Sequence, residues 1–235
     1  MTDEILAQIR AHAAAEFPRE CCGLVVVRKG KARYWPCRNL ATVSEQFHLH
    51  PEDYAAAEEE GDVLTIVHSH PNLSPQPSQA DLVGCEASGL PWLIVNWPTG
   101  ETYEWAPTGY VAPLVGRVFS HGVLDCYSLI RDYYARELQI TLPDFARQDN
   151  WWKTGQDLYR DNFQAAGFVS IDASALRRHD VILMQLSANT TNHGAIYLGD
   201  GRILHHPMNR LSGRDAYGGY WQNITTLYLR HREVP

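Results

Sequence analysis

An apolar run at residues 63–67, Val-Leu-Thr-Ile-Val, leads directly into His68-Ser69-His70, and Ser78-Gln79-Ala80-Asp81 follows. A short apolar run of this kind predicts a buried β-strand. Residues i and i+2 of a strand project to the same face, so His68 and His70 can bind one ion. A helix that begins at Ser78 can add Asp81. Two imidazoles, a carboxylate and an open fourth position form the ligand set of a catalytic zinc, so Zn²⁺ is the predicted cofactor.

Two observations limit this interpretation. Ser78-Gln79-Ala80-Asp81 also fits the capping pattern at the start of many ordinary helices, although one Asp can both cap and bind. His48-Leu49-His50-Pro51 repeats the His-x-His-Pro spacing without a following Ser-x-x-Asp. We therefore expect that second pair to end a strand before a helix at 51–60, and we do not expect it to bind metal.

The length and the charge of the chain limit its number of domains and its kinds of partner. Its 235 residues favour two domains over one. With 27 acidic and 20 basic residues, the formal charge of −7 offers no basic surface for nucleic acid or anionic lipid. We expect no nucleic-acid partner.

The N-terminus and the cysteines indicate the compartment. Residues 1–16 mix charged and apolar side chains as an amphipathic helix does, not as a signal peptide does. No apolar run approaches the roughly 20 residues that span a bilayer. The five cysteines form no evenly counted disulfide framework. We expect synthesis in a cytoplasm without a signal peptide, reduced thiols and no membrane insertion.

The first half of the chain reads as a compact α/β unit. The helix at 1–16 precedes expected strands at 22–27, 32–36 and 46–50, a helix from 51, and a strand at 63–68. A helix at 78–88 and strands at 92–96 and 101–105 complete the unit. Residues 107–115, rich in Pro and Gly, are the expected linker between domains at 1–106 and 116–235.

Residues 1–106 resemble a JAMM/MPN metalloprotease domain, which has a cytidine-deaminase-like fold. The resemblance rests on His-x-His-Pro, on Ser-x-x-Asp, and on the early Glu in Pro18-Arg19-Glu20-Cys21-Cys22-Gly23-Leu24. It implies that His68, His70 and Asp81 are zinc ligands. It also implies that Glu20 is the general base on the zinc-bound water and that Ser78 helps to hold the oxyanion.

The second half reads as one domain with helices before its sheet. A helix is expected near Cys126 and another at 151–166, followed by strands at 181–186, 195–198, 202–205 and 224–229. Cys126 follows Asp125 at the start of the first helix. The exposed N–H groups and the dipole of a helix N-terminus favour the thiolate, which is the nucleophilic form of cysteine.

A thiol nucleophile also needs an imidazole within reach. His193 begins an expected strand, and His205 lies on the next strand after a Gly-Asp-Gly turn, where it can orient the first ring. His121 is a weaker candidate for the base. His206 should face the opposite side of its strand. Trp151, Trp152 and Tyr159 can line a groove, but aromatic residues at helical spacing more often form core.

Residues 116–235 resemble the NlpC-type cysteine peptidases of the cell wall, which are papain-like. The shared pattern has three parts: Asp-Cys, a His before a glycine-rich strand, and a later polar residue. The strand reads Gly-Ile-Tyr-Leu-Gly in the family and Gly-Ala-Ile-Tyr-Leu-Gly here. The resemblance implies Cys126 as nucleophile, His193 as base and His205 as the orienting residue. Tyr127 and Ser128 stand where cell-wall enzymes usually have Ser-Gly, so pocket shape and substrate preference are open.

The two domains in this order resemble the tail-tip assembly protein K family of long-tailed phages. That resemblance implies a zinc-dependent (iso)peptidase and a cysteine endopeptidase that cuts peptidoglycan stem peptides, during tail assembly or genome entry. It implies other tail-tip proteins as partners, and a place in the host cytoplasm during assembly and at the virion tail tip. The alternatives are a structural adaptor without hydrolysis and a host peptidase for cell-wall recycling.

Overall fold

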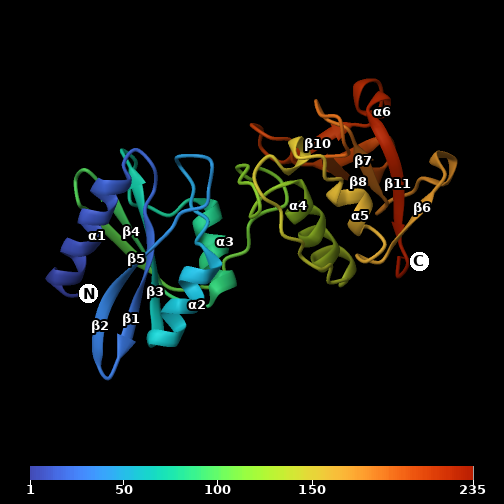
Figure 1. Ribbon diagram of the computed structural model, residues 1–235. Helices are drawn as coiled ribbons and strands as arrows, with labels where there is room; N and C mark the ends of the chain where they lie inside the picture. The colour runs from blue at the N-terminus through green and yellow to red at the C-terminus, as the bar shows by residue number, and fades with distance from the viewer. Residues whose placement is uncertain (235) are drawn as a thin grey trace. The chain divides into compact units, whose positions relative to one another are not determined.

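The computed structural model describes residues 1–234, which divide into two compact units, one over residues 1–111 and one that begins at Ala112 (Figure 1). Each unit has its own sheet and its own core. No helix among the described residues has the length and apolar character needed to cross a membrane. All five cysteines are free thiols.

The N-terminal unit is built on a five-stranded sheet in the order β2-β1-β3-β4-β5. β3 and β4 are parallel, and the other neighbours are antiparallel. Its elements, in chain order, are α1 (Asp3–Glu16), β1 (Cys22–Arg28), β2 (Lys31–Cys37), α2 (Pro51–Glu60), β3 (Asp62–Pro71), α3 (Gln79–Ser88), β4 (Trp92–Trp97) and β5 (Thr102–Trp105).

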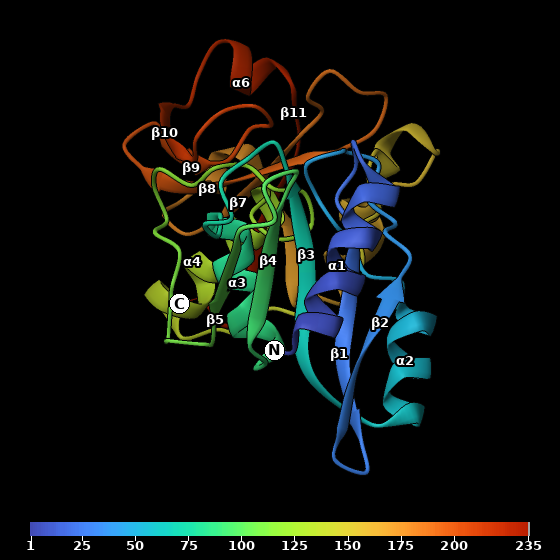
Figure 2. The same ribbon diagram turned by 90° about the vertical axis from the view of Figure 1, so that its left-hand side faces the viewer.

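Helices cover both faces of this sheet, with α1 on one side and α2 and α3 on the other (Figures 1 and 2). Alternate residues of a strand face opposite sides, so β1 supplies Val25 to the core under α1 and Leu24 to the core under α2 and α3. Both faces of β1 are therefore apolar, and this central strand is buried. The burial fixes the register of β3 and hence the position of its histidines.

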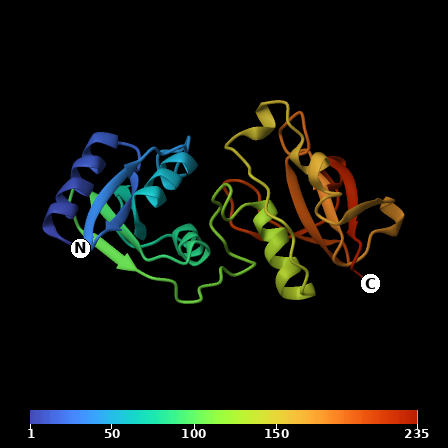
Figure 3. The same cartoon turned by 60° about the horizontal axis from the view of Figure 1, so that its bottom comes forward.

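The C-terminal unit has a six-stranded sheet in the order β10-β9-β8-β7-β11-β6 (Figure 3). Helix α4 (Cys126–Tyr133) contacts β8 and β9 and runs on into a π-helical turn at Tyr134–Leu138. The other elements are a 3-10 turn (Trp151–Lys153), α5 (Leu158–Asn162), β6 (Phe168–Ile171), a 3-10 turn (Ala173–Ala175), β7 (Val181–Met184), β8 (His193–Gly199), β9 (Arg202–His205), β10 (Gly213–Ala216), α6 (Tyr220–Asn223) and β11 (Thr225–His231).

Two expected elements are absent from the described residues. The helix expected at 151–166 is wrong: Asn150 and Gly155 adopt left-handed conformations, and only the 3-10 turn and α5 form. The strand expected at 46–50 is also wrong, since it makes only the bridge between Asn39 and Leu49. The side chain of Asn39 holds this segment instead, because it donates to Gln46 O and accepts from His48 N.

Two strands were not predicted. β6 and β10 are four-residue edge strands, and the sequence of β10, Gly-Arg-Asp-Ala, has no apolar alternation to indicate a strand. Each of them joins the sheet through backbone pairing with one neighbour, β10 with β9 and β6 with β11. The remaining expected helices and strands agree with the structure to within a few residues.

Candidate active sites

His68 and His70 lie side by side near the end of β3, where the strand is enclosed by β1 and β4. Their Nε2 atoms are 3.2 Å apart. Oδ1 of Asp81 lies 3.3 Å from Nε2 of His68, and Oδ2 lies 3.5 Å from Nε2 of His70. Zinc bonds of 2.0–2.1 Å in a tetrahedron place ligand atoms about 3.3 Å apart. The donor types and their spacing therefore fit one zinc ion.

Asp81 reaches this point because of how α3 begins. Ser78 N donates to Asp81 Oδ2 over 2.7 Å, and Asp81 N donates to Ser78 Oγ over 3.2 Å, which is a reciprocal capping box. The capping interpretation and the metal interpretation of Asp81 are thus compatible. Burial opposes ionisation, but the histidines beside it and the Ser78 contact hold the pKa of Asp81 well below its usual range.

The two imidazoles have different surroundings. Nδ1 of His70 donates to the carbonyl of Ser74 over 2.7 Å, which leaves Nε2 without a proton and free to bind metal. The ring of His68 instead stacks on Phe47, with centroids 4.5 Å apart, and meets the edge of Trp92. Its Nδ1 makes no hydrogen bond among the described residues. On the Nδ1 side, aromatic packing takes the place of a hydrogen bond in orienting this ring.

Glu20 lies two residues before β1 and is buried, with 3% of its surface exposed. Ser69 N donates to Cys21 O, so continuing the β1–β3 register places Glu20 opposite His70. Burial raises the pKa of the Glu20 carboxyl to about 8, with Asp81 adding to the rise and His70 opposing it. Such a carboxyl holds its proton more tightly than an ordinary glutamate does, so its carboxylate form is the stronger base.

Of the second histidine pair, His50 lies at the start of α2. His50 caps α2, because its Nδ1 accepts from Glu52 N over 3.2 Å, and the same atom lies 3.2 Å from Arg38 Nη2. Within residues 1–234, the group of side chains that converges as a set of metal donors is His68, His70 and Asp81.

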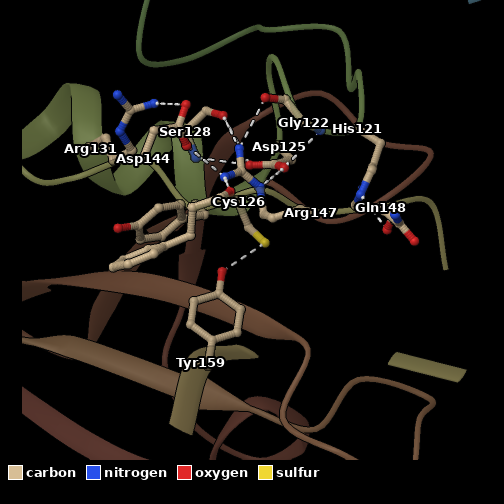
Figure 4. Close-up of polar contacts among 12 residues, drawn as sticks. His121, Gly122, Asp125, Cys126, Ser128, Arg131, Asp144, Arg147, Gln148 and Tyr159 are labelled. Atoms are coloured by element: carbon tan, nitrogen blue, oxygen red, sulfur yellow. Dashed lines mark hydrogen bonds and ion pairs between the residues drawn. The ribbon is translucent and has the colours of Figure 1, made fainter. Parts of the chain in front are cut away.

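In the C-terminal unit, Cys126 is the first residue of α4, and Asp125 is its N-cap (Figure 4). Asp125 Oδ1 accepts from Ser128 N over 2.9 Å, and Oδ2 accepts from Arg147 Nε over 2.8 Å. Arg147 also donates to Gly122 O, so it fastens the segment at 144–148 to the start of the helix. The ion pair is buried, with side-chain exposures of 7% and 3%.

His193 and His205 form the predicted pair on β8 and β9. Nε2 of His193 lies 3.1 Å from Nδ1 of His205. Behind them, Nε2 of His205 lies 3.1 Å from Oδ2 of Asp215, which sequence reasoning missed. Asp215 lies on β10, the strand that was not predicted. The only signal for Asp215 in the sequence is that a carboxylate follows His205 after a short loop.

The thiol of Cys126 contacts the hydroxyl of Tyr159 at 3.2 Å, as Figure 4 shows. Within residues 1–234, the structure shows no hydrogen bond between this thiol and His193. Both side chains nevertheless line one cavity of about 530 Å³. Burial raises the pKa of Cys126 to about 11 and lowers that of His193 to about 3. Burial thus disfavours both the thiolate of Cys126 and the imidazolium of His193.

Other candidates also line this cavity. His121 faces Gln148 O at 3.2 Å and packs against Trp152. His206 is buried against Phe119 and lines the same cavity, whereas its position in the strand predicted the opposite side. The chain turns at Pro207 directly after it, and β9 already ends at His205. Tyr159 is not simply core, since its hydroxyl reaches the thiol.

Two family models match the chain. Prokaryotic homologs of the JAB domain match residues 2–107, and the NlpC/P60 family matches residues 100–230. The predicted order, an α/β JAMM/MPN-type domain before a papain-like NlpC-type domain, is thereby confirmed.

Relatives match over much of the chain. Tail tip assembly protein K of Escherichia phage N15 is 43% identical over 237 residues, covering 100% of this chain and 97% of that protein. Tail tip assembly protein K of Escherichia phage lambda is 42% identical over 184 residues, covering 78% of this chain and 89% of that protein. Among solved structures, RipD from Mycobacterium tuberculosis, a non-catalytic NlpC/p60 domain protein, is 24% identical, covering 47% of this chain and 67% of that one, with a TM-score of 0.29.

Proposed function

On the premise that this chain belongs to the tail tip assembly protein K family, we propose that it works in a phage tail tip as a hydrolase with two catalytic units. Its expected partners are other tail-tip proteins and peptidoglycan peptides, and its expected place is the host cytoplasm during assembly and then the tail tip. The observation that carries the proposal is the convergence of His68, His70 and Asp81 at tetrahedral spacing.

In the N-terminal unit, His68, His70 and Asp81 would hold zinc, with residues 1–106 as the domain. A bound zinc would supply a Lewis acid that polarises an amide carbonyl and activates water. Glu20 is the proposed proton acceptor, since it is buried and the strand register places it opposite His70. Ser78 Oγ accepts from Asp81 N, and its hydroxyl is the proposed donor to a developing oxyanion.

In the C-terminal unit, which we place at residues 116–235 after a linker at 107–115, Cys126 is the proposed nucleophile and His193 its base. His205 holds Nε2 of His193 at 3.1 Å, so Nδ1 of His193 is the nitrogen left for the thiol proton. The low pKa of His193 keeps the ring neutral, which is the form that accepts a proton. We propose a papain-like endopeptidase that cuts peptidoglycan stem peptides.

Zinc content tests the first unit. Purified protein should contain about one zinc per chain, and His68→Ala should lose it. His50→Ala is the matched control, because it removes an equivalent imidazole that caps a helix. A well-folded protein without zinc would remove the metallopeptidase from the proposal.

Peptidoglycan digestion tests the second unit. The wild-type protein should release stem-peptide fragments from purified peptidoglycan, and Cys126→Ala should abolish the release. Cys85→Ala is the control, since this buried thiol belongs to the core of the other unit. Activity that survives Cys126→Ala would reject the thiol mechanism.

A structural adaptor is the second candidate. The observation that favours it is that Cys126 contacts Tyr159 and not His193. A phage carrying both His68→Ala and Cys126→Ala should then assemble tails and infect normally. A loss of infectivity with tails intact would instead place the hydrolytic step at genome entry, and co-purification with tail proteins would separate both from a host recycling enzyme.

A further inference from the structure

The hydroxyl of Tyr159 is the polar side-chain group at hydrogen-bond distance from the proposed nucleophile, 3.2 Å from Sγ of Cys126 (Figure 4). It comes from α5, far along the chain from α4. The ring is held at the edge of Tyr127, with centroids 6.1 Å apart, and beside Trp151 at 6.3 Å. These contacts fix where the hydroxyl lies.

Strand β8 leaves room for the Tyr159 hydroxyl. Gly194 follows His193 on β8, and a Cβ added there would lie 3.1 Å from the Tyr159 hydroxyl and 2.7 Å from Cδ1 of Ile130. A side chain at residue 194 would therefore displace Ile130 and crowd the hydroxyl. The absence of a side chain beside the base allows thiol, hydroxyl and imidazole to share one cavity.

We propose that Tyr159 is a further catalytic residue of the thiol site, whose hydroxyl donates a hydrogen bond to Sγ once the thiol proton has moved to His193. In that step the S–H bond breaks, an N–H bond forms at Nδ1 of His193, and the electron pair stays on sulfur. A thiolate has no hydrogen to donate, so Tyr159 is then necessarily the donor. The inference rests on the proposed thiol peptidase.

The charges around Sγ explain why a donor is needed. Burial and the neighbouring carboxylate of Asp125 both raise the pKa of Cys126, while Tyr159, the backbone of Gly194 and Arg147 lower it. His193 lies on the same cavity wall but makes no hydrogen bond to the thiol in the described structure. Burial raises the pKa of Tyr159 well above its usual value, so the tyrosine keeps its proton when the thiol ionises. The Tyr159 hydroxyl therefore still has a hydrogen to donate when Cys126 is a thiolate.

Alkylation by iodoacetamide tests this without any peptide substrate. Tyr159→Phe keeps the ring packing and removes the donor, and it should slow alkylation of Cys126 at pH 7.5 by about ten-fold or more, because hydrogen bonds to charged groups are the strong ones. The alkylation midpoint should move to higher pH. Tyr220→Phe, which removes an exposed hydroxyl from the same unit, should leave the rate unchanged.

Each outcome decides the matter. An unchanged rate in Tyr159→Phe would show that the hydroxyl does not stabilise the thiolate, and a faster rate would show that it shields the thiol; either overturns the inference. If the wild type neither reacts nor cleaves peptidoglycan, the proposed peptidase fails as a whole. Should Tyr159→Phe not fold, Gly194→Ala must slow alkylation by displacing the same hydroxyl, and a wild-type rate there rejects the inference.

Discussion

Asp215 Oδ2 lies 3.1 Å from Nε2 of His205, the ring nitrogen that does not contact His193. A carboxylate only accepts, so Nε2 of His205 carries the proton and Nδ1 does not. Nδ1 of His205 then accepts from Nε2–H of His193. The proton of His193 is thereby held on Nε2, and its Nδ1 is left unprotonated. One carboxylate thus sets the tautomers of two rings.

Asp215→Asn should therefore impair the thiol site without disturbing the fold. The Asn amide can donate to His205 Nε2, which would reverse both tautomers and place a proton on Nδ1 of His193. We expect kcat for peptidoglycan peptides to fall by about 100-fold or more, as for other triads with a wrong tautomer. The measurement is kcat against KM, with thermal unfolding as a check on folding.

Asp200→Asn provides the matched control, since this carboxylate is 91% exposed in the turn between β8 and β9. Its activity should equal that of the wild type. If Asp215→Asn kept full kcat, Asp215 would not be setting the tautomers.

The sequence predicted those parts of the molecule that depend on local patterns. The apolar run of β3 and the capping box at Ser78 are local, so both elements that hold His68 and Asp81 were expected at the right residues. Asp215 and the contact of Tyr159 with the thiol escaped prediction, because each residue reaches its site through tertiary packing of a short element. β10 has no apolar period, and α5 forms only after Gly155 interrupts the longer helix that aromatic spacing suggested.

Phe47→Ala should weaken zinc binding. The Phe47 ring stacks on His68 with centroids 4.5 Å apart and an angle of 25°, and Nδ1 of His68 lacks the hydrogen bond that orients most metal-binding histidines. Removing the ring should lower zinc affinity by about 10-fold, within the range seen when outer partners of metal ligands are lost. Competition with a chromophoric chelator measures the change.

The control for that experiment is Phe17→Ala, because Phe17 is 44% exposed at the end of α1. Its zinc affinity should match the wild type. Equal affinities for all three proteins would mean that His68 is oriented by its backbone and not by Phe47.

Asp125→Ala should destabilise the C-terminal unit by about 3 kcal/mol. The substitution removes the N-cap of α4 and leaves the buried Arg147 without its buried partner, and breaking buried ion pairs is costly. Urea unfolding of the wild type, Asp125→Ala, Arg147→Met and the double variant measures the coupling. The double variant should lose clearly less stability than the sum of the two single variants.

Asp144→Ala separates the buried pair from the exposed one. Asp144 also contacts Arg147 at 2.8 Å, but its side chain is 52% exposed, so the loss should stay below about 1 kcal/mol. A loss as large as that of Asp125→Ala would mean that the segment at 144–148, and not the helix cap, carries the stability.

Acid should destabilise the C-terminal unit through its buried histidines. Burial lowers the pKa of His193 to about 3 and that of His206 to about 4, from 6.5 in an unfolded chain. Between pH 6.5 and about 4 the unfolded chain binds more protons than the folded one, so stability falls as pH falls, by up to about 1.4 kcal/mol per pH unit for each group. Thermal unfolding from pH 7.5 to 5 should show a falling midpoint, and His206→Phe should make the fall shallower. Parallel curves for the two proteins would show that the pKa of His206 does not differ between the folded and the unfolded chain.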